Sequence, residues 1–265
     1  MRLGQIISQL LLACLPLLLV AQASPPPDMA MKAAAGNADA QFALAEVLFG
    51  ERVAVPDVAG ALQWYRRAAE GGNPEAHAKL AAIYWYGHKV PQDRAISRRW
   101  RLSAANLGHV PSMLVLAQDY DLGVGVERDA AESARWAKRA ADAGDAQGQY
   151  LLATKYLGGL GVPKHDQEGA RLCRLAANQM HLAAVSHLGV LYLNGQGVPR
   201  DAAEAYRLLL IAKKFAATAA FEPRFFLEKC EALLTPAQRA EIQQRAESDA
   251  QAIRKAGAEK SPPGR

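Results

Sequence analysis

YLNGQGVPRDAAEAYRLL, residues 192–209, consists of a tyrosine, a glycine-x-glycine turn and a run with helical periodicity. Such a turn could open a phosphate-binding loop, but a dinucleotide site also requires a preceding strand, a third glycine and a later acidic residue. None of these surrounds Gly195 and Gly197. Related stretches instead begin at Tyr120 and Tyr156, so three copies follow one another at intervals of 36 residues. The glycine loop therefore belongs to an internal repeat.

The first half of each repeat predicts a helix, called helix A, with one face that can approach another helix closely. One position holds leucine in all five repeats, and a small residue follows it. A second small residue lies four positions before the leucine, on the same helical face. The leucines are Leu44, Leu80, Leu116, Leu152 and Leu188.

The second half of each repeat predicts another helix, helix B, that begins at a capping side chain. Aspartate suits this place because its carboxylate accepts from the free amides of a helix start. The residues in the capping position are Asp57, Asp93, Asp129, His165 and Asp201. A large residue follows within helix B, at Trp64, Trp100, Trp136, Leu172 and Leu208. We expect this position, and Trp100 in particular, to be buried between stacked hairpins.

Each repeat is thus a helical hairpin whose apolar faces are too extensive for one hairpin to bury, so neighbouring hairpins must stack. The prediction is an all-α protein, an α/α superhelical solenoid of about five repeats with a C-terminal helical cap. The pattern A-x-x-x-L-A/G-x-x-Y-x-x-G-x-G-V-P-x-D, followed by tryptophan, a double alanine and glycine, resembles the Sel1-like repeat, a relative of the tetratricopeptide repeat. The resemblance implies a right-handed scaffold for protein partners, with envelope roles in bacterial members, and no catalytic residue.

The chain outside the repeats predicts four further segments around residues 36–215. Residues 1–23 have Arg2, an apolar core and the small residues Ala21 and Ala23, the features of a secretory signal cleaved after Ala23. The apolar core is too short for a transmembrane span, so we expect a periplasmic or secreted protein. Residues 24–35 form a short lead-in, residues 216–254 two capping helices, and residues 255–265 a disordered tail.

Charge and cysteine content leave two questions open. The formal charge of +5 is spread along the chain, which does not favour a nucleic-acid partner. Four arginines nevertheless share one position of helix B, namely Arg99, Arg135, Arg171 and Arg207. This basic stripe is either a solvated outer face or a contact for an anionic envelope polymer. Cys173 and Cys230 are either two buried free thiols or a disulfide.

Catalytic signatures are not found in the sequence. Serine followed three residues later by lysine, the lipase elbow and a zinc-binding histidine pair are all missing, and the six histidines form no ligand spacing. We therefore expect no enzymatic activity, no metal and no cofactor, and a scaffold that binds a protein or peptide partner. The alternative is an envelope enzyme, most plausibly a cell-wall hydrolase, which would require convergent polar groups.

Partner binding should use helix-A positions that do not keep the repeat pattern, because packing between similar hairpins does not explain their variety. In tetratricopeptide-like arrays the A helices line the groove. On the face given by positions 79, 82 and 86, successive repeats present polar or aromatic side chains. These candidate partner-binding residues are Glu46, Lys79, Tyr86, Gln118, Thr154, His187 and Asn194. Tyr86 is the best anchor, since it can bury a ring and still offer a hydroxyl.

Overall fold

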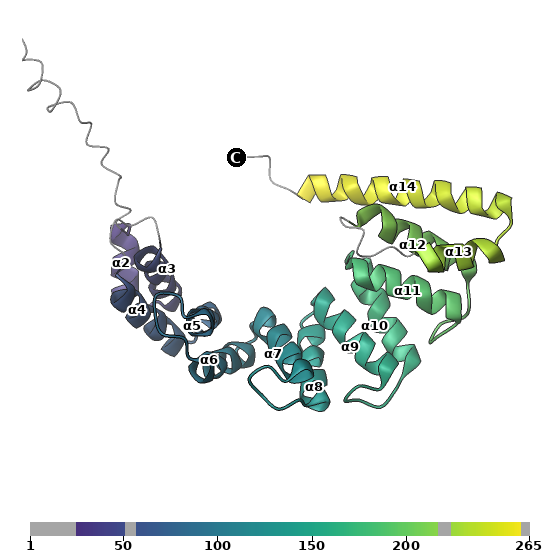
Figure 1. Cartoon of the computed structure of the whole chain (residues 1–265). Coiled ribbons are helices and arrows are strands. Elements are labelled where there is room, and N and C mark those ends of the chain that lie inside the picture. Colours follow the sequence, from purple (N-terminus) through teal and green to yellow (C-terminus); the bar gives the residue numbers. More distant parts are fainter. Residues whose placement is uncertain (1–24, 51–56, 217–223, 261–265) are drawn as a thin grey trace, which may run out of the picture. The chain divides into compact units, whose positions relative to one another are not determined.

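The computed structural model describes residues 25–50, 57–216 and 224–260, and over these residues it contains helices and no strand. The predicted signal peptide lies outside the described residues. The chain divides into two compact units, residues 1–109 and 110–265. Consecutive helices pair as hairpins within each unit (Figure 1). The described chain is therefore the all-α repeat solenoid that the repeat predicted.

Unit 1 contains five helices in its described part. They are α2 (Pro27–Ala34), α3 (Ala38–Phe49), α4 (Val58–Glu70), α5 (Pro74–Tyr86) and α6 (Arg94–Asn106). Helices α3 and α5 are A helices, and α4 and α6 are the B helices that follow them. The lead-in at residues 24–35 thus contains a helix. This helix, α2, has Pro27 in its first turn and packs on α3.

Unit 2 contains three more repeats and the C-terminal helices. Its helices are α7 (Val110–Leu122), α8 (Ala130–Asp142), α9 (Ala146–Gly158), α10 (Asp166–Asn178), α11 (Leu182–Asn194), α12 (Ala202–Phe215), α13 (Arg224–Leu233) and α14 (Pro236–Lys260). Both α13 and α14 pack on α12. Thr235 and Gln238 form a reciprocal capping box at the start of α14, with Gln238 Oε1 2.9 Å from the Thr235 amide nitrogen.

The predicted tail is wrong in its boundary, because α14 continues to Lys260 instead of stopping at 254. Alanine, glutamate and lysine in this last stretch are good helix formers, and the next prolines follow only at positions 262 and 263. The residues after 260 lie outside the described part of the chain.

The predicted caps of the B helices are confirmed. The carboxylates of Asp57, Asp93, Asp129 and Asp201 each accept from the amide three residues later, at 2.8–3.0 Å. In the fourth repeat, His165 Nδ1 takes this role and accepts from the Glu168 amide at 3.1 Å. An imidazole nitrogen can replace a carboxylate here because only one acceptor is needed.

The two glycines of each turn have different tasks. The first, at Gly159 and Gly195, ends helix A in the left-handed conformation, with φ near 65° and 70°. The second allows the turn to touch the preceding B helix. A Cβ on Gly161 would lie 1.9 Å from the Ala130 carbonyl oxygen, and one on Gly197 would lie 2.1 Å from that of Asp166. The recurrent glycines are therefore explained by hairpin geometry, without a ligand.

At two places a residue other than glycine takes a glycine position of the repeat and keeps the same backbone. Met180 replaces the terminal glycine of helix B with φ 61°, and Lys89 replaces the second turn glycine, also with φ 61°. Side chains other than glycine pay a steric cost in this region. The hairpin geometry thus persists in repeats where the local sequence does not favour it.

The expectation for the shared tryptophan position is only partly correct. Trp136, Leu172 and Leu208 are buried, whereas Trp64 and Trp100 are half-buried. Trp100 packs edge-on against His77, with ring centroids 5.4 Å apart.

Cys173 and Cys230 are both free and buried. Cys173 Sγ lies 3.3 Å from the Ala184 carbonyl oxygen, so this thiol joins α10 to α11.

Candidate functional site

Three of the predicted partner-binding residues lie on α3 and α5 of unit 1, and two of them contact each other. Lys79 Nζ lies 2.8 Å from Glu46 Oε1, and the buried Tyr65 hydroxyl donates to the same oxygen at 2.5 Å. Burial, and then the hydrogen bond to Glu46, raise the pKa of Tyr65 well above its usual range. Glu46 and Lys79 are therefore partly engaged inside the chain, and they hold the two A helices together.

Tyr86 stands beside these residues at the end of α5 and is 77% exposed. It lines a cavity of about 300 Å³ together with Phe49, Lys79, His88, Lys89 and neighbouring backbone and aliphatic groups. Lys89 Nζ lies 2.6 Å from the Phe49 carbonyl oxygen and 4.8 Å from the centre of the Phe49 ring. The cavity thus combines ring surfaces, two ammonium groups and an exposed phenol, and we call it the Tyr86 cavity.

The other four predicted residues lie in unit 2. Gln118 on α7 and Asn194 at the end of α11 are exposed. Thr154 is half-buried, and its hydroxyl donates to the Leu151 carbonyl at 2.7 Å within α9. His187 is half-buried beside Tyr150, and burial lowers its pKa. No described hydrogen bond or ion pair joins these four side chains to one another, so unit 2 does not assemble them as a site.

Sequence reasoning missed an ion pair on the A helices of unit 2. Lys155 on α9 lies with its Nζ 2.8 Å from Asp121 Oδ1 on α7, and the lysine side chain is only 3% exposed. Its repeat position holds valine, isoleucine or leucine in three other repeats, at Val47, Ile83 and Leu191. A lysine at a repeat position that is apolar in three of the five repeats was the signal that could have found it.

The basic stripe on the B helices is largely neutralised from within the chain. Arg135, Arg171 and Arg207 pair with the glutamates three residues before them, at 2.5, 2.7 and 2.6 Å. Hydrogen bonding to Arg171 lowers the pKa of Glu168. Arg99 differs because Ile96 stands where these repeats have glutamate. A continuous row of free guanidinium groups is therefore not what the structure presents.

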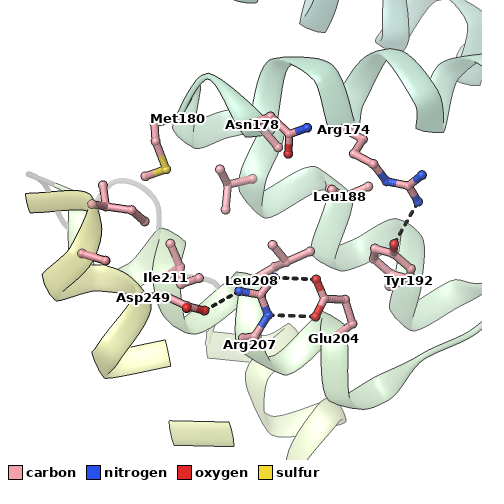
Figure 2. A pocket seen from close by; sticks show the side chains of 14 residues that line it. Arg174, Asn178, Met180, Leu188, Tyr192, Glu204, Arg207, Leu208, Ile211 and Asp249 are labelled. Carbon is pink, nitrogen blue, oxygen red and sulfur yellow. Dashed lines mark hydrogen bonds and ion pairs between the residues drawn. The ribbon is translucent and has the colours of Figure 1, made fainter. Parts of the chain in front are cut away.

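A larger cavity of about 430 Å³ lies among α10, α11, α12 and α14 of unit 2 (Figure 2). Leu188, Leu208 and Ile211 give it apolar walls, and Arg174 on its rim donates to the Tyr192 hydroxyl at 2.8 Å. Arg207 binds both Glu204 and Asp249, and the hydrogen bonds that it donates to Glu204 are the main cause that raises its pKa. We call this the α14 cavity, because α14 supplies part of its wall.

Reactive groups do not gather within the described residues. No cluster of three or more histidine, cysteine, aspartate or glutamate side chains there could hold a metal ion. Burial raises the pKa of Cys173 to about 12 and that of Cys230 to about 11, so both thiols are poor nucleophiles at neutral pH. Among the described helices, none combines the length and the apolar character needed to cross a membrane.

Comparison with known proteins places these features in a family. The family model for the Sel1 repeat matches residues 38–73, 74–109, 110–145, 146–181 and 182–214. The structure resembles that of a protective antigen of uropathogenic Escherichia coli strains that displays an SLR fold. That match has a TM-score of 0.67 and 27% sequence identity, and it covers 89% of this chain and 51% of the other. This chain thus spans about half the length of that antigen.

A second solved structure is similar in fold. It is a Sel1 repeat protein from Oxalobacter formigenes, with a TM-score of 0.63, 22% identity and coverage of 86% of this chain and 67% of the other. Comparison with curated protein sequences gave no match. The matched repeats cover most of the chain, with borders that follow the helical hairpins described above. The chain therefore belongs to the Sel1 repeat family.

Proposed function

We propose that the chain is a non-catalytic adaptor of the bacterial cell envelope that binds a protein or peptide partner through the Tyr86 cavity. Sel1 repeat proteins generally mediate protein–protein interaction. The observation that carries the proposal is the exposure of Tyr86 above a cavity that already holds a phenyl ring and two lysines. Tyrosine is among the residues that dominate binding energies at protein interfaces.

The chemistry of the cavity favours a segment with an apolar or aromatic side chain next to an acidic one. Phe49 and Tyr86 offer ring surface, and Lys79 and Lys89 offer positive charge at its edge. Lys79 already shares its charge with Glu46, so the partner's acidic group should meet Lys89 more strongly. Binding would then combine burial of a ring with a partly screened charge contact.

Affinity capture from an envelope extract tests this assignment. Tyr86→Ala should lose the partner because it removes an exposed ring without opening the core. Phe225→Ala is the matched control, since Phe225 is also a largely exposed ring, on α13. If Tyr86→Ala, Phe225→Ala and the unmodified protein recover the same amount of partner protein, the Tyr86 cavity is not the binding site.

Export is a separate part of the proposal and rests on the signal-like residues 1–23. Intact-mass spectrometry of protein recovered from the periplasm should show an N-terminus at Ser24. Recovery of full-length protein from the cytoplasm, or a lipid on Cys14, would contradict it.

A hydrolase acting on cell-wall material has no observation in its favour, and release of soluble fragments from peptidoglycan by the purified protein would reinstate it.

A further inference from the structure

A second cavity of unit 1, about 370 Å³ in volume, lies where α4, α5 and α6 contribute side chains. It is lined by Arg66, Tyr84, Ile96, Arg99, Trp100 and Ser103. Arg66 donates to the Tyr84 hydroxyl at 3.1 Å, and the indole of Trp100 is half-buried. We call it the Trp100 cavity.

The Trp100 cavity is the repeat equivalent of the α14 cavity. Each of its six lining residues precedes a residue of the α14 cavity by 108 positions, which is three repeats of 36. The corresponding residues of the α14 cavity are Arg174, Tyr192, Glu204, Arg207, Leu208 and Ile211. Both cavities also contain the same hydrogen bond, from an arginine of one B helix to the tyrosine of the next A helix. The same surface position of the repeat therefore forms a cavity in both units.

In unit 2 this position is occupied by a segment of the chain itself. Asp249 on α14 lies with Oδ2 2.5 Å from Arg207 Nη1, and Ala252 and Ile253 line the same cavity (Figure 2). Positions i, i+3 and i+4 lie on one face of a helix. The occupant is thus a helix that presents a carboxylate and, one turn later, an aliphatic side chain.

Two residue changes leave the position open and more basic in unit 1. Ile96 stands where Glu204 neutralises Arg207, and the described residues include no carboxylate paired with Arg66 or Arg99. In the neighbouring repeats, Arg67 stacks on Trp64 and Arg139 stacks on Trp136. Ser103 occupies the same repeat position as these arginines, so Trp100 lacks the arginine that stacks on the other two rings. The cavity consequently offers the guanidinium groups of Arg66 and Arg99 beside the half-buried ring of Trp100.

We propose that the Trp100 cavity binds an acidic helical segment of a protein partner, with a carboxylate on Arg99 and an aliphatic side chain one turn later against Trp100. Charge complementarity requires an anion, and planar carboxylates suit guanidinium groups. The inference adds a second surface to the proposed function and rests on it only in taking a protein segment as the occupant. The α14 segment of a second copy is not free for this role, because its own Asp249 is bound to Arg207.

The probe for this proposal is a labelled peptide with the sequence of residues 236–260, which carries the Asp249 and Ile253 pair. Its binding to the full mature chain is followed by fluorescence anisotropy. The decisive variant is Ile96→Glu, because it gives Arg99 the internal partner that the other stripe arginines have. Asp93 caps the same helix, so an acid three residues later also suits the fold. Circular dichroism and a melting curve confirm that the variant is folded.

The peptide should bind the unmodified chain, and Ile96→Glu should weaken it by about tenfold or more. Arg135→Ala should change binding less than about twofold, since Arg135 is already paired. A peptide that carries Asp249→Asn should bind the unmodified chain as weakly as the original peptide binds the Ile96→Glu variant. This agreement would show that the carboxylate and Arg99 act together.

Two outcomes would overturn the proposal. One is equal binding of the peptide to the unmodified chain and to Ile96→Glu, because the peptide would then bind elsewhere. The other is no binding of the peptide while polygalacturonate binds in a manner that Ile96→Glu abolishes, which would assign the cavity to an anionic saccharide. Neither outcome depends on Tyr86, so failure here remains distinct from failure of the Tyr86 cavity.

Discussion

At the scale of single residues, the shared tryptophan position shows that side chains at one repeat position can differ in burial and in contacts. Trp64 and Trp136 each carry an arginine three residues later that stacks on the ring, at 4.7 and 4.6 Å from its centre. Trp136 is 8% exposed, whereas Trp100 has Ser103 in that place and lines an open cavity. One repeat position is therefore buried in one hairpin and lines a cavity in another.

This difference predicts unequal costs of truncation. Trp136→Ala should lower the free energy of unfolding by about 3–5 kcal/mol, because it leaves a large void in a buried place. Trp100→Ala should cost clearly less, about 1–3 kcal/mol, since part of its surface is already in water. Urea denaturation of both variants measures the two losses. A larger loss for Trp100→Ala would mean that the burial assigned to this position is reversed.

Met180 provides a second test at one residue. Met180→Gly should raise the free energy of unfolding by about 0.5–1 kcal/mol, because relief of the left-handed conformation exceeds the entropy cost of glycine. Gly144→Ala is the reverse experiment at the equivalent place, with φ 84° and open space around the added methyl group. It should destabilise by about 1–2 kcal/mol. Thermal melts that show both changes in one direction would contradict the backbone explanation.

At the scale of helices, ion pairs join successive A helices in both units. Glu46 and Lys79 connect α3 with α5, and Asp121 and Lys155 connect α7 with α9. The two pairs differ in exposure, because Lys155 is almost fully buried and Lys79 is not. The buried pair is therefore the more sensitive joint, since a buried charge without its partner is costly.

Asp121→Asn should accordingly destabilise more than Lys155→Met. The first change leaves a buried ammonium without a carboxylate, and we expect a loss of about 1–3 kcal/mol after allowing for the partial exposure of Asp121. The second replaces the ammonium by an apolar group of similar length, which burial favours. Chemical denaturation at pH 7 compares them. A greater loss for Lys155→Met would show that the pair itself supplies net stability.

The histidines at α11 predict a dependence of stability on pH. Burial lowers the pKa of His187 and of His181 below the ordinary 6.5. Between that value and the folded pKa the unfolded chain binds more protons, so stability falls as pH falls. His187→Gln should reduce the slope measured between pH 7.5 and 5.5. The pKa values of the Asp166, Glu168 and Glu247 carboxylates are lowered, so these groups change the pH dependence of stability only below about pH 4.5.

Helices, caps and turns were predictable from the sequence because each depends on residues close together in the chain. Asp129 caps α8 through an amide three residues away, and Gly195 ends α11 by its own conformation. The site was less predictable because it depends on contacts across 30 or more residues, such as Glu46 with Lys79. Repeat spacing showed which positions vary, but it did not show that Gln118, Thr154, His187 and Asn194 remain apart.

At the scale of the whole molecule, the two units differ in how their cavities are occupied. Unit 2 engages its cavity with its own C-terminal helix, through Asp249 and Arg207. Unit 1 has two cavities, at Tyr86 and at Trp100, that no described segment of the chain fills in the same way. We therefore expect unit 1 to carry the partner contacts of this Sel1 repeat protein.

Site-specific photocrosslinking in cells tests whether unit 1 carries the partner contacts. A photoreactive phenylalanine analogue replaces Tyr86 in one strain and Phe225 in a control strain, both being largely exposed rings. We expect a discrete crosslinked product of higher mass from position 86, containing one partner protein, and no such product from position 225. A crosslinked product from position 225 alone, or the same products from both positions, would contradict it.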